Sequence, residues 1–208
     1  MGSRRSPEAA DLRGGHRPRR GHSANFPTGK TLASWRAEDS TIPEPTQNSL
    51  ITLEWIGRAE NLVIAGPSGT GKSHFTEGPA RAAIEKDLRV TWFTLETLAA
   101  AIGKSKVDGS TARTVARICR ADLIVIDDIG LLPVGEDAAE AFYRIIDAAY
   151  ERRSIVVTSD IHPSEWDRSF GDRRLCAAIV DRITFRCSLI QTGTESYRLQ
   201  ATCDERSI

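Results

Sequence analysis

Residues 61–73, NLVIAGPSGTGKS, have the types and spacing needed to hold a polyphosphate. From Gly66 to Ser73 they match the phosphate-loop pattern G-x-x-x-x-G-K-[ST] at every fixed position. Glycines let such a loop turn its backbone N–H groups inward around phosphate. The N-terminus of a following helix adds partial positive charge at the same point. We therefore expect Lys72 to reach the β- and γ-phosphates of a nucleotide and the Ser73 hydroxyl to ligate Mg²⁺.

The predicted nucleotide contacts are a continuous run of the chain. They are Gly66, Pro67, Ser68, Gly69, Thr70, Gly71, Lys72, Ser73 and His74. A second Gly-Lys-Thr occurs at 29–31, but it lacks the first loop glycine and a preceding apolar strand. We interpret that second occurrence as a turn.

Two carboxylates, Asp127 and Asp128, end the run DLIVIDD, which is typical of a buried parallel strand. An acid at such a strand tip can hold the water shell of Mg²⁺, so we predict that Asp127 shares the metal with Ser73. Asp128 is then placed to orient or deprotonate the water that attacks the γ-phosphate. The alternative for either residue is an aspartate that caps the next turn.

A third polar strand tip follows the apolar run at 154–158, where the chain reads Thr158, Ser159, Asp160. A polar side chain here can sense the γ-phosphate, and we assign that role to Asp160; a strand-to-helix cap is the alternative. The acidic pair, and the extra strand expected at 89–94 ahead of it, favour an ATPase over a small-molecule kinase. A kinase would need a lid of arginines over the donor phosphates, and the sequence offers no clear one. The predicted cofactors are ATP and Mg²⁺.

The elements that must position these residues alternate along the chain. Strands are expected at 61–65, 89–94, 122–127, 154–158, 185–190 and 196–200, and helices at 46–58, 72–86, 95–103, 110–120, 137–150 and 163–182. Such alternation predicts an α/β fold, a three-layer P-loop NTPase domain of the AAA+ type with a mainly parallel sheet and helices on both faces. Pro79 lies inside the second helix, where we expect a kink.

Charge and composition divide the chain unevenly. The 208 residues carry no net charge, yet residues 1–36 hold eight Lys/Arg against two acids. We predict a basic disordered arm at 1–24, an extension with a short helix at 25–58, the ATPase domain at 59–201 and a tail at 202–208. The arm is typical of nucleic-acid binding; a solvated tail or a misassigned start site explains it equally well.

Two further features bear on the compartment. The four cysteines show no metal-ligand spacing, and no apolar run approaches the roughly 20 residues of a membrane span. We expect a cytoplasmic protein with free thiols and no membrane partner.

Several segments resemble the IstB-like family, ATPase helpers of insertion-sequence transposition within the AAA+ group that are close to DnaC-type helicase loaders. The matching segments are RAENLVIAGPSGTGKSHF, ADLIVIDDIGLLP, EDAAEAFYRIIDAAYERRSIVVTSD, HPSEWDRSFGD, AAIVDRI and ESYRL. They follow the family's order over about residues 46–200, and FPTGKT-x₃-SW before them resembles the N-terminal segments of some relatives. The GLLP, HPSEW and VDRI segments make the resemblance specific, because a phosphate loop and an acidic pair alone would say only "ATPase".

The resemblance implies an ATP-bound homo-oligomer that loads on duplex DNA and directs a transposase. It matches Arg182 to an arginine finger that would reach the ATP of a neighbouring subunit; a helix-end arginine paired with an acid such as Asp181 is the alternative. The family usually has Glu at position 128, where it tolerates Asp, and Asn at position 160, so this chain departs from the usual residue at both. Asp160 would place negative charge near the γ-phosphate, so we hypothesise slow hydrolysis.

DNA contact is assigned to a basic cluster between the two phosphate-site strands, Lys104, Lys106, Arg113, Arg117 and Arg120. Phosphate contacts need only such a density of Lys and Arg, although a solvated helix face explains it as well. Two other functions stay open. One is a DnaC-like helicase loader, whose partner is a replicative helicase. The other is an ATP-binding interaction module from a degenerate element, impaired in hydrolysis.

Overall fold

The computed structural model describes residues 26, 29, 31, 34–37, 40–130 and 133–193. Its elements, in chain order, are α1 (Glu44–Ile51), α2 (Glu54–Gly57), β1 (Asn61–Ala65), α3 (Lys72–Glu85), β2 (Val90–Thr94), α4 (Leu95–Val107), α5 (Thr111–Ile118), β3 (Leu123–Ile129), α6 (Glu136–Ala149), β4 (Ser154–Ser159), the 3₁₀ helix η2 (Pro163–Arg168), α7 (Arg173–Thr184) and β5 (Cys187–Gln191). The predicted arm at 1–24, the strand at 196–200 and the tail at 202–208 lie outside the described residues.

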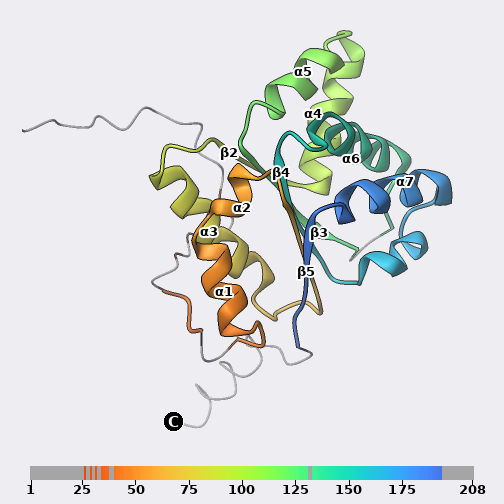
Figure 1. The fold of residues 1–208 in the computed structure, drawn as a ribbon. Coiled ribbons are helices and arrows are strands. Elements are labelled where there is room, and N and C mark those ends of the chain that lie inside the picture. The colour runs from red at the N-terminus through yellow and green to blue at the C-terminus, as the bar shows by residue number, and fades with distance from the viewer. Residues whose placement is uncertain are drawn as a thin grey trace, which may run out of the picture.

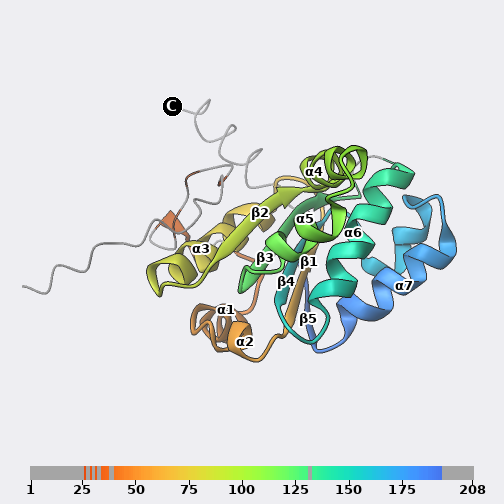
Figure 2. The ribbon, with the colours of Figure 1, turned by 90° about the horizontal axis from the view of Figure 1, so that it is seen from above.

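In the described part of the chain, five parallel strands form one sheet in the order β2-β3-β4-β1-β5. Parallel strands bring all their carboxyl ends to one edge, so the chain leaves β1, β3 and β4 at three adjacent points of that edge. The three polar segments that follow or end these strands are therefore neighbours. Figure 1 shows the sheet nearly edge-on in the middle of the molecule, and Figure 2 shows its strands side by side.

Helices cover both faces of the sheet, which confirms the predicted three-layer α/β architecture. Figure 2 shows α1, α2 and α3 on one side and α4, α6 and α7 on the other. Strand side chains alternate between the two layers. Val63 packs in the core with α4, α6 and α7, whereas its neighbours Leu62 and Ile64 pack in the core with α1, α2 and α3.

Two predicted helices are divided in the structure, and a third, predicted at 95–103, extends to Val107 as α4. The helix expected at 46–58 is two helices, because Leu53 between them takes a left-handed backbone conformation with φ +65°. The helix expected at 163–182 is also divided, into η2 and α7. His162 caps η2 by accepting from the backbone N–H of Ser164 at 3.2 Å, and the Trp166 ring of η2 is fully buried. The HPSEW segment thus builds this turn.

Helix α3 continues through Pro79 to Glu85. Proline lacks the amide that would bond the carbonyl oxygen of Phe75, four residues earlier. The expected kink stays a prediction.

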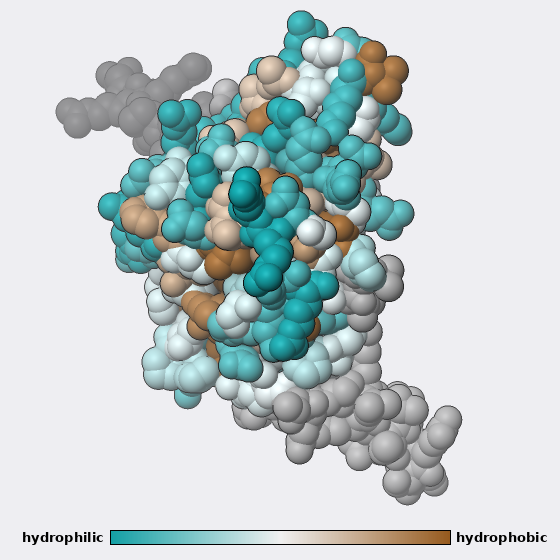
Figure 3. Space-filling view, turned by 90° about the vertical axis from the view of Figure 1, so that its right-hand side faces the viewer, coloured by the Kyte–Doolittle hydropathy of each residue, from teal (hydrophilic) through white to brown (hydrophobic). Residues whose placement is uncertain are grey.

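Helices α6 and α7 lie on the right-hand side in Figure 1, and Figure 3 turns that side toward the viewer. The surface there is mostly hydrophilic, with small separate hydrophobic patches. Among the described residues no helix combines the length and apolarity needed to cross a bilayer.

Candidate functional site

The phosphate loop joins β1 to α3 and is packed against the chain that follows β5. Strand β5 pairs in register with β1, Ala65 opposite Gln191, so Thr192 lies beside Gly66. A Cβ atom at Gly66 would stand 2.0 Å from Thr192 Oγ1, and the backbone there has φ +152°. Thr70 Oγ1 and Thr192 Oγ1 are 2.7 Å apart. Only glycine at position 66 allows the backbone to come this close to Thr192, because any side chain there would clash with the Thr192 hydroxyl.

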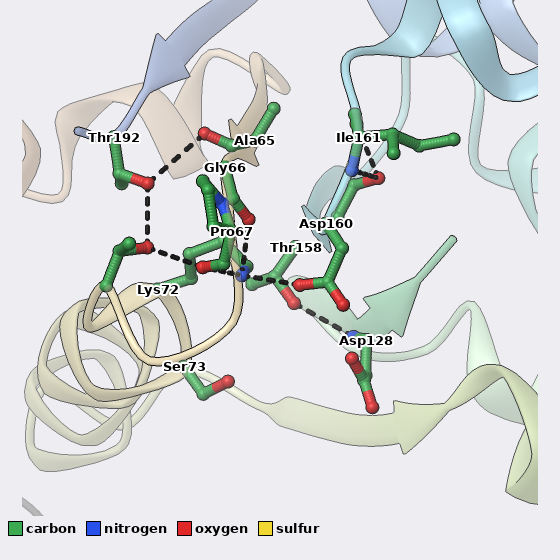
Figure 4. A network of polar contacts seen from close by, with 12 residues as sticks. Ala65, Gly66, Pro67, Lys72, Ser73, Asp128, Thr158, Asp160, Ile161 and Thr192 are labelled. Atoms are coloured by element: carbon green, nitrogen blue, oxygen red, sulfur yellow. Dashed lines mark hydrogen bonds and ion pairs between the residues drawn. The ribbon is translucent and has the colours of Figure 1, made fainter. Parts of the chain in front are cut away.

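Lys72 is the first residue of α3 and is only 7% exposed. Its ammonium donates to Gly66 O at 2.7 Å, to Pro67 O at 2.9 Å and to Asp160 Oδ1 at 2.8 Å. An ammonium has three N–H donors, and all three are used. Figure 4 shows Lys72 and Asp160 pointing toward each other across the gap between the loop and β4.

The acidic pair sits on a β-bulge at the end of β3. Pairing with β4 is regular up to Ile126 opposite Val157, and resumes with Ile129 opposite Ser159, so β3 has one extra residue between these points. A bulge re-aims side chains locally. As a result Asp127 is buried, 6% exposed, whereas Asp128 is exposed and has φ +66°.

Asp127 faces the phosphate loop. Its Oδ1 accepts from Ser73 Oγ at 3.1 Å and also from the Thr158 hydroxyl. Thr158 Oγ1 in turn accepts from the backbone N–H of Asp128 at 2.9 Å. Thr158 therefore ties both members of the acidic pair to β4. Figure 4 shows the Asp128 carboxylate pointing away from the Lys72–Asp160 pair.

This arrangement fits a nucleotide with Mg²⁺. Hydroxyl and carboxylate oxygens are the ligands that Mg²⁺ takes, usually one or two from the protein together with phosphates and waters. Ser73 and Asp127 supply two such oxygens within 3.1 Å of each other. The described residues hold no cluster of three or more His, Cys, Asp or Glu that could bind a metal alone. A metal ion at this point would thus need phosphate oxygens to complete its ligands and to neutralise the rest of its charge.

The extension before the domain packs on the start of α3. The Trp35 ring lies 5.0 Å from the His74 ring and 5.1 Å from the Phe75 ring, centroid to centroid. Trp35 Nε1 donates to Gln47 Oε1 at 2.7 Å, and Gln47 is 2% exposed. Ser34 Oγ lies 3.2 Å from His74 Nε2. The nucleotide contact predicted for His74 stays a prediction, since its ring faces this extension.

Arg182 lies far from the phosphate loop of its own chain. It is in the last turn of α7, next to the amino ends of the strands, as Asn61 at the start of β1 shows by donating to Ile183 O at 3.2 Å. Arg182 Nε donates to Asp147 Oδ1 of α6 at 3.1 Å, and the guanidinium lies 5.2 Å from the centroid of the Tyr143 ring. Its acidic partner is thus Asp147 and not the adjacent Asp181.

The basic cluster divides into two kinds of residue. Lys106 donates to Glu140 Oε2 at 2.6 Å and to Asp137 Oδ1 at 2.9 Å, and these bonds raise the pKa of Lys106. Three other members, Lys104, Arg113 and Arg117, are exposed and line a groove of about 660 Å³ between α4 and α5. No ion pair within 4 Å joins any of the three to another residue in the described part of the chain.

The sequence did not identify two features of the site. One is Thr192, and the other is the hydrogen bond that the Thr158 hydroxyl donates to Asp127. The signal for Thr192 is its place directly after β5, which becomes informative only when β5 is known to lie beside β1. Thr158 was visible at its strand tip, but its contact depends on the bulge in the neighbouring strand.

Comparison with known proteins gives a family and a fold. The family model described as "IstB-like ATP binding protein" matches residues 12–204. The ATP-binding protein of insertion sequence IS21 from Pseudomonas aeruginosa is 32% identical over 159 residues, 76% of this chain and 60% of that protein. The ATP-binding protein of IS232 from Bacillus thuringiensis subsp. berliner is 31% identical over 150 residues, 72% of this chain and 60% of that protein. This chain thus spans about 60% of the length of these two relatives.

Among solved structures, the AMPPCP-bound DnaA from Aquifex aeolicus matches with a TM-score of 0.64 and 20% identity, covering 88% of this chain and 56% of that one. The DnaC helicase loader matches with a TM-score of 0.57 and 18% identity, covering 72% of this chain and 87% of that one. At these identities the likeness concerns the fold alone, which is the AAA+ type of P-loop domain. The family match covers most of the chain, and the chain belongs to the IstB-like ATP binding protein family.

Proposed function

We propose that this chain is an ATP-binding and ATP-hydrolysing helper of DNA transposition, which assembles as a homo-oligomer on duplex DNA and directs a transposase. The observation that carries the proposal is the convergence of Lys72, the Ser73–Asp127 pair and Asp128 at one edge of the sheet. The names of the insertion-sequence relatives support the transposition context.

The residues around the phosphate loop have defined roles in this proposal. Lys72 pairs with the β- and γ-phosphates, and the loop backbone N–H groups surround them. Ser73 and Asp127 hold Mg²⁺, which when bound neutralises phosphate charge during transfer. Thr158 keeps the Asp127 carboxylate aimed at Ser73 by donating to the same oxygen, Oδ1.

Asp128 orients or deprotonates the attacking water. Its exposure supports access to water, which a general base here needs. Its carboxylate points away from the Lys72–Asp160 pair, so the role requires the side chain to turn toward the γ-phosphate. The neighbouring Asp127 is buried and already bonded to two hydroxyls, so it is the poorer base.

Arg182 acts on the ATP of a neighbouring subunit. Its distance from its own phosphate loop is compatible with a role between subunits, and its side chain keeps 28% exposure beside Asp147. The bond to Asp147 is also what the alternative, a helix-end arginine paired with an acid, would form. Charge supplied in this way stabilises the transition state of phosphoryl transfer. A mixing experiment tests the role: Lys72→Ala and Arg182→Ala proteins are assayed alone and together. Recovery of hydrolysis only in the mixture supports a shared site, and no recovery contradicts it.

Duplex DNA binds along the α4–α5 groove. Lys104, Arg113 and Arg117 present three cations there, none of them in an ion pair within 4 Å among the described residues, and phosphates need such cations. The groove also contains Asp108, which interacts electrostatically with Arg113. The adjacent Lys106 is occupied by Asp137 and Glu140.

Two alternatives share the same site. The DnaC-like fold is compatible with a helicase loader, which differs only in its partner. Asp160 favours an ATP-binding module that hydrolyses slowly, because its carboxylate faces the lysine that must serve the γ-phosphate. If Asp160→Asn leaves the hydrolysis rate unchanged, the idea that Asp160 slows hydrolysis is wrong.

The first experiment measures ATP hydrolysis with and without duplex DNA for the wild type and for Lys72→Ala. Hydrolysis that DNA stimulates and that Lys72→Ala abolishes supports a DNA-coupled ATPase. Nucleotide binding without turnover favours the interaction module. Adding a purified transposase, and separately a replicative helicase, to the active protein distinguishes the two partners by which one changes the rate.

A further inference from the structure

The Asp160 carboxylate binds the Lys72 ammonium, as the terminal phosphate of a nucleotide would. The two side chains are 12% and 7% exposed, and their charged atoms are 2.8 Å apart. The other two donors of the Lys72 ammonium are held by loop carbonyl oxygens. A γ-phosphate that takes Lys72 must therefore displace at least one existing acceptor.

The backbone holds Asp160 in this position. Its N–H donates to Ile129 O at 2.9 Å, which joins the end of β4 to the end of β3. Just after it, Ile161 N donates to Ser159 Oγ at 3.3 Å, and Ser159 is fully buried. The carboxylate can turn only about its own side-chain bonds, so it cannot retreat far from an incoming phosphate.

A di- and a triphosphate meet this carboxylate differently. The γ-phosphate brings its negative charge to Lys72 and so places a second anion close to the Asp160 carboxylate, in a site largely shielded from water. Like charges at such distances repel strongly when solvent is excluded. A diphosphate ends one phosphate earlier, so the Lys72–Asp160 pair can persist while the loop backbone binds the rest.

We infer that Asp160 makes this site selective for ADP over ATP, as a built-in competitor for the place of the γ-phosphate. The inference rests on the proposed nucleotide binding and adds to it a preference between nucleotides. It concerns affinity and is separate from the rate of hydrolysis. Asp160→Asn keeps the shape of the side chain and removes the charge.

The test measures dissociation constants for Mg·ADP and for Mg·AMPPCP, a triphosphate analogue, by titration calorimetry on the full chain. The wild type is expected to bind ADP more tightly. Asp160→Asn is expected to strengthen AMPPCP binding by on the order of tenfold while ADP binding changes little, since the repulsion involves only the third phosphate.

Two further variants separate charge from shape. Asp160→Glu keeps the negative charge and is expected to keep the preference for ADP. Asp160→Ala removes the charge together with the side chain and is expected to shift the ratio in the same direction as Asp160→Asn. If both nucleotides bind the wild type and Asp160→Asn leaves their ratio within twofold, the inference fails while the proposed function stands. If neither nucleotide binds the wild type, the proposed function itself fails.

Discussion

Removing three cations of the α4–α5 groove should weaken DNA binding and should also make the binding constant depend less steeply on salt concentration. The change is Lys104→Ala, Arg113→Ala and Arg117→Ala together. All three side chains are exposed on helices, and alanine is a good helix former, so the fold should be kept. Each phosphate that a cation neutralises contributes about 0.9 to the slope of log K against log salt. Three contacts would therefore lower the steepness of this dependence by about 2.7.

That difference is large enough to measure. Between about 50 and 200 mM salt, a slope difference of 2.7 means that the wild type loses affinity by roughly 40-fold more than the triple variant. Fluorescence anisotropy with a labelled duplex and saturating nucleotide analogue gives the two slopes. Two unrelated duplex sequences should give the same difference, because phosphate contacts carry no sequence information.

Lys106→Ala is the matched control. It removes one positive charge from α4, the helix that also carries Lys104, but the Lys106 ammonium is already bonded to Asp137 and Glu140. We expect its slope to stay near that of the wild type. An unchanged slope in the triple variant, or an equal loss in Lys106→Ala, would refute the assignment of the groove to DNA.

Three further experiments test the packing around the nucleotide loop and the chemistry of one thiol. Gly66→Ala should abolish nucleotide binding in calorimetry, because the new Cβ would stand 2.0 Å from Thr192 Oγ1; adding Thr192→Ala should restore only part of it, since the positive φ remains. Trp35→Phe should lower the free energy of unfolding by about 1–3 kcal/mol in urea titrations, since it leaves the buried Gln47 Oε1 without its donor; an unchanged midpoint would show that this bond contributes little. Burial raises the pKa of the Cys187 thiol to about 11, so its alkylation, followed by peptide mass mapping, should speed up about tenfold per pH unit between roughly pH 8 and 10; a plateau below pH 9 would contradict this environment.

The sequence alone identifies the segments that carry the site, because polar residues follow or end its apolar runs. Asp127 ends one run, Asp160 follows another by two residues, and Lys72 belongs to the phosphate-loop pattern after β1; the structure brings all three to one sheet edge. The alternation of strands and helices predicts the three layers, because consecutive parallel strands must be joined by helices that pack on the faces of the sheet. The roles of these residues remain proposals.

Contacts between distant segments could not be predicted, because they depend on strand order and on local irregularity. The bulge that turns Asp127 inward and Asp128 outward has no signature in the run DLIVIDD. Leu53 takes a left-handed conformation without being glycine or asparagine, so the break between α1 and α2 was also hidden. The Arg182–Asp147 bond joins two helices that only the packed structure brings together.

The order of the strands also has a consequence for how the protein is made. Strand β1 carries the phosphate loop, yet both of its neighbours in the sheet, β4 and β5, come roughly 90 residues or more later in the chain. Ribosomes add about 5–20 residues per second, and pairing between such distant segments is slow. A nascent chain would therefore expose the loop for several seconds before Asp160 and Thr192 exist. The nucleotide site is complete only after β4 and β5 have been synthesised, so a nucleotide that arrives earlier meets the loop without Asp160 and Thr192.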